Sequence, residues 1–481
     1  MSKHPMVWIL VAALAPGVAV AVCEPTFETV PRALARTWVP IPPHLPDPGE
    51  DTVWTHPTQR NGHALRVHHV ADKAVLQAAG IAPETLNTRH EYSQHSAFSA
   101  TGRWLVSHGK EQRVLFDGMQ YKPVRTVQDN GPLLDWLWDP VDDDTAYYVS
   151  QSTHAVVRYD VETDTHTPAF TRAQLARHLD LPNADALRLE GHHGQGALSA
   201  SGDRLVTKFA RGEDAVVVVF NPRTADVISH ATFPGLAGRR NMDWQALSPS
   251  GKHVIVQAQF DALYGTQFAG SRGTQQVRVF DTARFEATSG KLVIGRPSHF
   301  DVMQNSNGRE FFVIAGSQPP QGWRGLSSPP RGLVQGLYTV DLDSLTWRQH
   351  LNFRERFQNG VPAAHVSAAP DRAEVLLSFY QGGNEDSASD AQTTPLLLVD
   401  LDATWRVRTA WMGWDLAANP GRGNSSQGYL AQPHASFSPG VWLANGERGL
   451  KLVWASDNNR RDARVGNLVV AEVICPAGAT R

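Results

Sequence analysis

One strand-turn-strand phrase recurs seven times along this 481-residue chain, and it restricts the possible fold more than any other feature. In each copy a strand-like run enters a short turn rich in Ser, Asp and Gly, and a second apolar run leaves it. A repeat of roughly 40 to 70 residues built from three or four short strands is typical of a β-propeller, whereas paired β-sandwiches do not repeat one phrase in this way. We therefore predict an all-β, seven-bladed β-propeller with short helical insertions. The copies begin at His95, Leu133, His193, Asp243, His299, His365 and His434.

The segments around the repeats predict how the ring closes. HALRVHHVAD, residues 63 to 72, is a strand candidate that precedes the first repeat, and we expect it to supply the outer strand of the last blade. Residues 72 to 80 and 171 to 182 are expected to be helical, the second with a Thr N-cap and a leucine face.

The N-terminal segment indicates export. Residues 1 to 22 combine a short positive start, an apolar run and the small-x-small sequence Ala19-Val20-Ala21, as in a secretory signal peptide. This run contains Pro and Gly and is too short for a comfortable transmembrane helix. We expect a proline-rich lead at 23 to 60, a propeller at 61 to 476, no transmembrane segment, and a periplasmic or secreted monomer.

Two cysteines lie at opposite ends of the mature chain. Cys23 and Cys475 can form one disulfide in an oxidising compartment and so tie the two ends together. The alternatives are two unrelated thiols, or a lipidated Cys23.

The charge balance restricts the partners. Lys and Arg number 44 against 47 Asp and Glu, which argues against a protein that coats nucleic acid. An anionic partner must therefore be met by local cations.

Histidines stand at the start of the innermost strand in five of the seven repeats. That strand lines the central channel of a propeller, so these imidazoles are expected to converge on one funnel, with Trp136 and Asp243 or Trp244 in the other two blades. A lone histidine there is usually a polar residue on a solvated wall, but five permit metal binding or proton transfer. The five are His95, His193, His299, His365 and His434.

One part of this set suits a divalent metal. Gln432 and His434 are two positions apart, so on a strand they share a face, and His365 lies on the neighbouring blade. Their oxygen and nitrogen donors are suited to manganese, zinc or calcium.

Long loops add cations and aromatic groups to the same rim. Tyr264 and Arg272 lie between glycines in the loop 260 to 276, and the alternative for Arg272 is a surface salt bridge that caps the loop. Arg239 and Arg240 precede the first strand of that blade. Trp323 lies among prolines at 317 to 332, where an indole suits stacking on a sugar ring.

The last three blades resemble those of oligogalacturonate lyases. QPHASFSPG (432 to 440), followed by KLVWASD (451 to 457) and NLVVAEV (467 to 473), is similar to the closing blade of that family. HVSAAPD from His365 and SHFDV (298 to 302) are similar to its sixth and fifth blades. The resemblance implies a seven-bladed propeller that cleaves uronate-containing oligosaccharides by β-elimination, with a divalent metal held by histidines and a glutamine.

The resemblance also implies individual roles. His365 and His434 match metal ligands, Gln432 stands where the family has the first histidine of its closing pair, and Tyr429 stands where it has the ligand glutamine. Arg272 falls near the catalytic arginine of the family and His299 matches its assisting histidine. The chain is also similar to propeller ulvan lyases, which implies roles for Tyr264, His193 and Arg272.

These observations predict a carbon-oxygen lyase that acts on acidic polysaccharides or oligosaccharides. A metal, or His193 with an arginine, would neutralise the uronate carboxylate, Arg272 or Tyr264 would remove the C5 proton, and His299 would assist. His95, Arg239, Arg240, Trp244 and Trp323 would contact the substrate. The alternative is a non-catalytic exported propeller of the Tol type that binds protein or glycan. A hydrolase is disfavoured because the sequence has no Gly-x-Ser-x-Gly elbow and no closely paired catalytic carboxylates.

Overall fold

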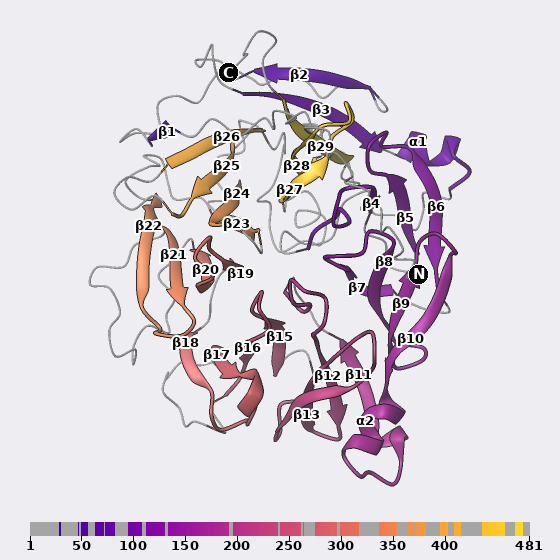
Figure 1. The fold of residues 1–481 in the computed structure, drawn as a ribbon, viewed down its shortest axis with the longest axis vertical. Coiled ribbons are helices and arrows are strands. Elements are labelled where there is room, and N and C mark those ends of the chain that lie inside the picture. Colours follow the sequence, from indigo (N-terminus) through magenta and orange to yellow (C-terminus); the bar gives the residue numbers. More distant parts are fainter. Residues whose placement is uncertain are drawn as a thin grey trace, which may run out of the picture.

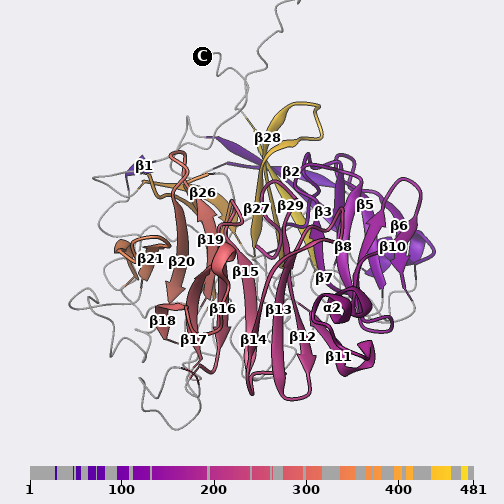
Figure 2. The same ribbon diagram turned by 60° about the horizontal axis from the view of Figure 1, so that its bottom comes forward.

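Seven antiparallel sheets surround a central axis as the blades of a propeller (Figure 1), which confirms the predicted fold class. In blades 4 to 7 the first strand lies nearest the axis and the later strands follow outward (Figure 1; turned view in Figure 2). The computed structural model describes residues 28–29, 47, 50–55, 63–71, 73–81, 95–107, 112–129, 133–191, 196–238, 241–260, 263, 275–295, 299–316, 336–353, 363–369, 372–380, 395–402, 408–414, 435–456 and 467–474.

Blades 1 to 4 follow one another in chain order. Blade 1 contains β4 (Trp104–Val106), β5 (Gln112–Asp117) and β6 (Pro123–Gln128), and a bridge between Phe98 and Leu105 adds its inner edge. Blade 2 contains β7 (Leu133–Trp138), β8 (Thr145–Ser150), β9 (Ala155–Asp160) and β10 (Thr165–Thr171). Blade 3 contains β11 (Leu187–Gly191), β12 (Leu205–Arg211), β13 (Asp214–Phe220) and β14 (Val227–Phe233). Blade 4 contains β15 (Met242–Leu247), β16 (His253–Ala258), β17 (Gln276–Asp281) and β18 (Lys291–Gly295).

Blades 5 to 7 complete the ring. Blade 5 contains β19 (His299–Gln304), β20 (Glu310–Gly316), β21 (Gly336–Asp341) and β22 (Trp347–Asn352). Blade 6 contains β23 (Ala363–Ala368), β24 (Glu374–Tyr380), β25 (Pro395–Asp400) and β26 (Arg408–Trp414), with β1 (Glu28–Thr29) at its outer edge. Blade 7 contains β27 (Ser436–Trp442), β28 (Arg448–Ser456) and β29 (Asn467–Ile474), followed outward by β3 (Ala64–Ala71) and β2 (Asp51–Thr55).

Middle strands of the blades are apolar on both faces because each face packs against a neighbouring blade. In β13 the run Ala-Val-Val-Val-Val-Phe is fully buried, and its side chains join a core that includes Phe170 of blade 2 and Phe260 of blade 4. A short continuous apolar run bounded by turns is the pattern expected of such a strand. The blade-to-blade interfaces are thus the hydrophobic core of the molecule.

The ring is closed by strands from both ends of the described chain, as predicted. β3 pairs antiparallel with β29, with Arg66 opposite Glu472 and Ala64 opposite Ile474. β2 then pairs with β3, and β1 pairs with β26. Two strands from the proline-rich lead therefore extend the sheets of blades 6 and 7.

A buried ionic cluster reinforces this closing seam. The Lys451 ammonium lies 3.6 Å from Glu472 Oε1 and donates to the carbonyl oxygen of Gly118 in blade 1, and both charged side chains are fully buried. The Tyr121 hydroxyl donates to the same carboxylate at 2.6 Å. Burial lowers the pKa of Lys451 to about 8, although Glu472 opposes that shift.

Both predicted helical insertions are present. The first contains α1 (Lys73–Ala78), and the second contains α2 (Arg172–His178). Thr171 caps α2 in a capping box with Gln174, and Leu175 faces the core. Two short 3₁₀ turns also occur, η3 (Ala184–Ala186) and η4 (Thr282–Arg284). No helix in the described ranges has the length and apolar character needed to cross a bilayer.

Candidate functional site

Two of the predicted histidines meet at the start of neighbouring inner strands. His299 is the first residue of β19 in blade 5, and His365 is the third residue of β23 in blade 6. Their ring centroids are 4.3 Å apart and the rings are inclined by 61°. The structure thus brings together a histidine that we expected to assist catalysis and one that we expected to bind a metal.

Burial makes the imidazole of His299 resist protonation. The loss of solvation lowers the pKa of His299 to about 4, although the residue as a whole is partly exposed. At neutral pH this ring is therefore uncharged and keeps a nitrogen lone pair. His365 is fully buried beside it.

Asp301 lies two residues along β19 from His299 and was not predicted from the sequence. Its carboxylate is buried and accepts backbone N–H bonds from Ala368 at 2.6 Å and from Val302 at 2.8 Å. The first bond joins the inner strand of blade 5 to that of blade 6. Burial raises the pKa of Asp301 well above its usual range, and the two backbone bonds oppose this shift. Residues two apart on a strand share a face, so the spacing between positions 299 and 301 is the one sequence feature that could have pointed to Asp301.

The chain directly after His434 also lies close to His365. Ala435 is buried, and its N–H donates to Ser378 Oγ at 3.2 Å. Ser378 on β24 is the register partner of His365 on β23. This bond joins the start of blade 7 to blade 6 at the register position of His365.

The donor set of this region fits a borderline divalent ion in part. The imidazole of His365 is a nitrogen donor of the kind that zinc prefers, whereas manganese would require oxygen donors as well. Within the described ranges no group of three or more His, Cys, Asp or Glu side chains is arranged to hold a metal. Further ligands would have to come from positions such as Gln432 and His434, which lie outside those ranges.

His95 lines a central cavity of about 300 Å³ whose wall includes residues from all seven blades. The imidazole of His95 is buried, and its Nδ1 lies 3.4 Å from the carbonyl oxygen of Trp136. Ser96 Oγ and Ser438 Oγ lie 3.1 Å apart across blades 1 and 7. Blades 5 and 6 contribute Val302 and Ala368 to this wall, and His299 and His365 are not among its residues.

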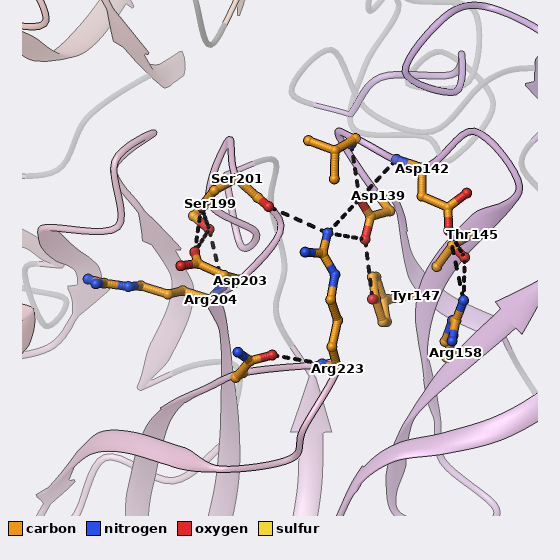
Figure 3. Close-up of polar contacts among 12 residues, drawn as sticks. Asp139, Asp142, Thr145, Tyr147, Arg158, Ser199, Ser201, Asp203, Arg204 and Arg223 are labelled. Carbon is orange, nitrogen blue, oxygen red and sulfur yellow. Dashed lines mark hydrogen bonds and ion pairs between the residues drawn. The ribbon is translucent and has the colours of Figure 1, made fainter. Parts of the chain in front are cut away.

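Asp139, which lines this cavity, belongs to a polar network that joins blades 2 and 3 (Figure 3). Asp139 is buried and accepts bonds from the Arg223 guanidinium at 3.2 and 3.3 Å, from the Tyr147 hydroxyl at 3.3 Å, and from two backbone N–H groups of its own turn. Burial and the neighbouring Asp139 raise the pKa of Tyr147 to about 12. Arg223 also donates to the carbonyl oxygen of Ser201. The network fixes the turns of two blades against each other.

Trp244 does not face the channel as we expected for a substrate contact. It is only 3% exposed, and its ring packs edge-on against Phe300 of blade 5 at 4.6 Å. A register shift in the pairing of β15 with β16 between Met242 and Trp244 changes the face on which the following side chains lie. The indole is therefore part of the core between blades 4 and 5.

The other predicted site residues lie outside the described ranges, and their roles stay predictions. The same holds for the disulfide. These residues are Tyr264, Arg272, His193, Arg239, Arg240, Trp323, Gln432, His434, Cys23 and Cys475.

Solved structures share this fold. An oligogalacturonate lyase in complex with manganese aligns with 89% of this chain and 97% of its own, at 12% identity and a TM-score of 0.51. An oligogalacturonate lyase from Vibrio parahaemolyticus aligns with 88% of this chain and 97% of its own, at 10% identity and a TM-score of 0.51. No family model and no curated protein sequence matches the chain. The likeness extends over most of the propeller, and at this level of identity it shows a common fold.

Proposed function

We propose that this protein is an exported polysaccharide lyase that cleaves uronate-containing poly- or oligosaccharides by β-elimination. The observation that carries the proposal is the contact between the imidazoles of His299 and His365, which lie on the inner strands of blades 5 and 6. The manganese in one structural neighbour and the lyase activity in both names support it as analogy. Export rests on residues 1 to 22 of the sequence.

The reaction sets three chemical requirements that this end of the channel can meet. The C6 carboxylate of the uronate must be neutralised, the C5 proton must be removed, and the leaving glycosidic oxygen must be protonated. A divalent ion held by His365 and His434, with Gln432, would supply the positive charge that neutralises the carboxylate.

The protein's own groups would do the rest. His299 is neutral at physiological pH because its pKa lies near 4, so it can accept a hydrogen bond from the substrate. It is too weak a base to hold a proton for long, so it suits an assisting role. Arg272 or Tyr264, from the loop of blade 4, would remove the C5 proton in this scheme.

The test is cleavage of a panel of polyuronates, followed through the ultraviolet absorbance of the unsaturated product, with and without a chelator. His365→Ala and His299→Ala should each lower the rate by about 10²- to 10⁴-fold. His154→Asn is a matched control, since His154 lies in a surface turn at a φ of 50° that asparagine tolerates, and it should keep the full rate.

Two results would refute the proposal. Full activity in both channel variants would exclude the assigned site. No cleavage of any polyuronate, together with tight glycan or protein binding, would instead favour a binding propeller of the Tol type.

A further inference from the structure

A second pair of histidines lies on the outer rim of blade 3, far along the chain from the channel residues. His178 is the last residue of α2 and is exposed, and His230 lies in the middle of β14 and is half-buried. α2 projects at the outside of the ring (Figure 1). This pair has no part in the proposed lyase reaction.

The two rings point nitrogen to nitrogen. His178 Nε2 lies 3.1 Å from His230 Nδ1, the ring centroids are 5.0 Å apart, and the rings are perpendicular at 89°. Two nitrogens bound at about 2.0 to 2.1 Å to one zinc ion are about 2.9 Å apart at a right angle and about 3.4 Å apart at the tetrahedral angle. The observed separation lies between these values.

The surroundings of His230 keep its ring in the neutral form that binds metal. Burial lowers the pKa of His230, and His178 and Arg211 lower it further, so the ring is neutral at physiological pH. The Arg211 guanidinium is paired with Asp214 at 3.7 Å, which reduces its repulsion of a cation. In the metal-free pair one ring donates its N–H to the other, and metal binding requires that this proton move to the opposite nitrogen of the same ring.

We propose that His178 and His230 bind one borderline divalent transition-metal ion, such as zinc or nickel, which clamps α2 to the outer strand of blade 3. Water would complete the coordination, since the described part of the chain places no third His, Cys, Asp or Glu in a metal-binding group here. The clamp would hold the insertion between β10 and β11 against β14.

The experiment is a zinc titration by calorimetry in the His365→Ala background, so that the channel site does not contribute. One binding event should remain there and should disappear when His178→Ala and His230→Ala are added. His154→Asn in the same background should keep it. The midpoint of thermal unfolding should rise with zinc concentration only in the proteins that retain the pair, as binding to the folded state requires.

The outcomes separate this proposal from the lyase proposal. Unchanged zinc binding after loss of both rim histidines would overturn the clamp, as would the absence of any binding in the His365→Ala protein. Both rim side chains are at least partly exposed, so the double variant should fold; its circular dichroism spectrum checks this. Neither result depends on whether a polyuronate is cleaved.

Discussion

Replacement of Asp139 by alanine should destabilise the propeller more than any other change in its turn. The carboxylate is 1% exposed and joins blades 2 and 3 (Figure 3). Its loss leaves three donors without an acceptor, the Tyr147 hydroxyl and the N–H groups of Val141 and Asp142. Arg223 is 43% exposed, so water can solvate its guanidinium once the partner is gone.

The magnitude follows from these contacts. At about 1 kcal/mol for each orphaned donor, and with a small term for the half-exposed Arg223, we expect a loss of about 3 kcal/mol in the free energy of unfolding. Tyr147→Phe removes one bond and should cost about 1 kcal/mol. Asp142→Ala is the matched comparison in the same turn. This carboxylate accepts from the Asp144 N–H and the Thr145 hydroxyl, but it is 46% exposed, so water can partly replace it and the loss should be smaller, about 1 kcal/mol.

Urea unfolding, followed by both tryptophan fluorescence and far-ultraviolet circular dichroism, measures these values. The two signals must change together for a single free energy to be meaningful. A loss below 1 kcal/mol for Asp139→Ala, or a loss equal to that of Asp142→Ala, would show that the network does not hold the blades together.

Three further predictions concern other parts of the ring. Burial and Arg348 lower the pKa of His350 from 6.5 to about 3, so between these pH values the unfolded chain binds a proton that the folded protein does not. The contribution of neutral His350 to the free energy of unfolding is fully present above pH 6.5. It should fall by up to about 5 kcal/mol as the pH is lowered towards 3. His350→Gln should flatten that acid slope in urea titrations, and an unchanged slope would contradict this. Gly191→Ala should lower the free energy of unfolding by about 1 to 3 kcal/mol more than Gly212→Ala. Gly191 has a φ of +90°, and a Cβ added there would lie 2.6 Å from Asp135 Oδ2, whereas a Cβ at Gly212 would have nothing within 4 Å. Equal losses in the two variants would refute this contact. Intact-mass measurement before and after reduction should reveal one Cys23–Cys475 disulfide in the exported protein, and free thiols or a lipid mass would exclude it.

The fold was predictable because one strand-turn-strand pattern repeats along the sequence. Each copy joins an inner strand to a second strand through a turn, and only a ring of blades uses such a unit repeatedly. The closing strand at 63 to 72 and the helix at 171 to 182 were also predictable, the first as a strand candidate before the first repeat and the second from its Thr N-cap and leucine face.

The site was predictable only where inner strands keep a regular period. His299 is the first residue of β19 and His365 the third residue of β23, and their rings are in contact. Bulges removed that regularity elsewhere. The shift after Met242 places Trp244 in the core, and a shift between Leu134 and Leu137 accompanies a φ of 56° at Asp135. Alternation cannot reveal such shifts, since one extra residue moves every later side chain to the other face.

The spacing of residues also does not predict which side chains the turns contact in the next blade. Asp139 lies in a run of acidic residues that looks like an ordinary solvated turn, yet it is the buried member. The distinction arises from Arg223 of the next blade, 84 positions along the chain. Contacts between blades depend on how neighbouring sheets stack, which no local pattern encodes.

The pairing of β3 with β29 determines when the ring of blades can close. Ala64 pairs with Ile474, which is 410 positions later, so blade 7 cannot form before almost the whole chain has been synthesised. Contacts of such long range are slow to form because the intervening chain must first be brought together. Until then β3 is an unpaired strand edge. A chain that must stay unfolded while it crosses a membrane would gain from this delay, since its ring closes only after the last strand arrives.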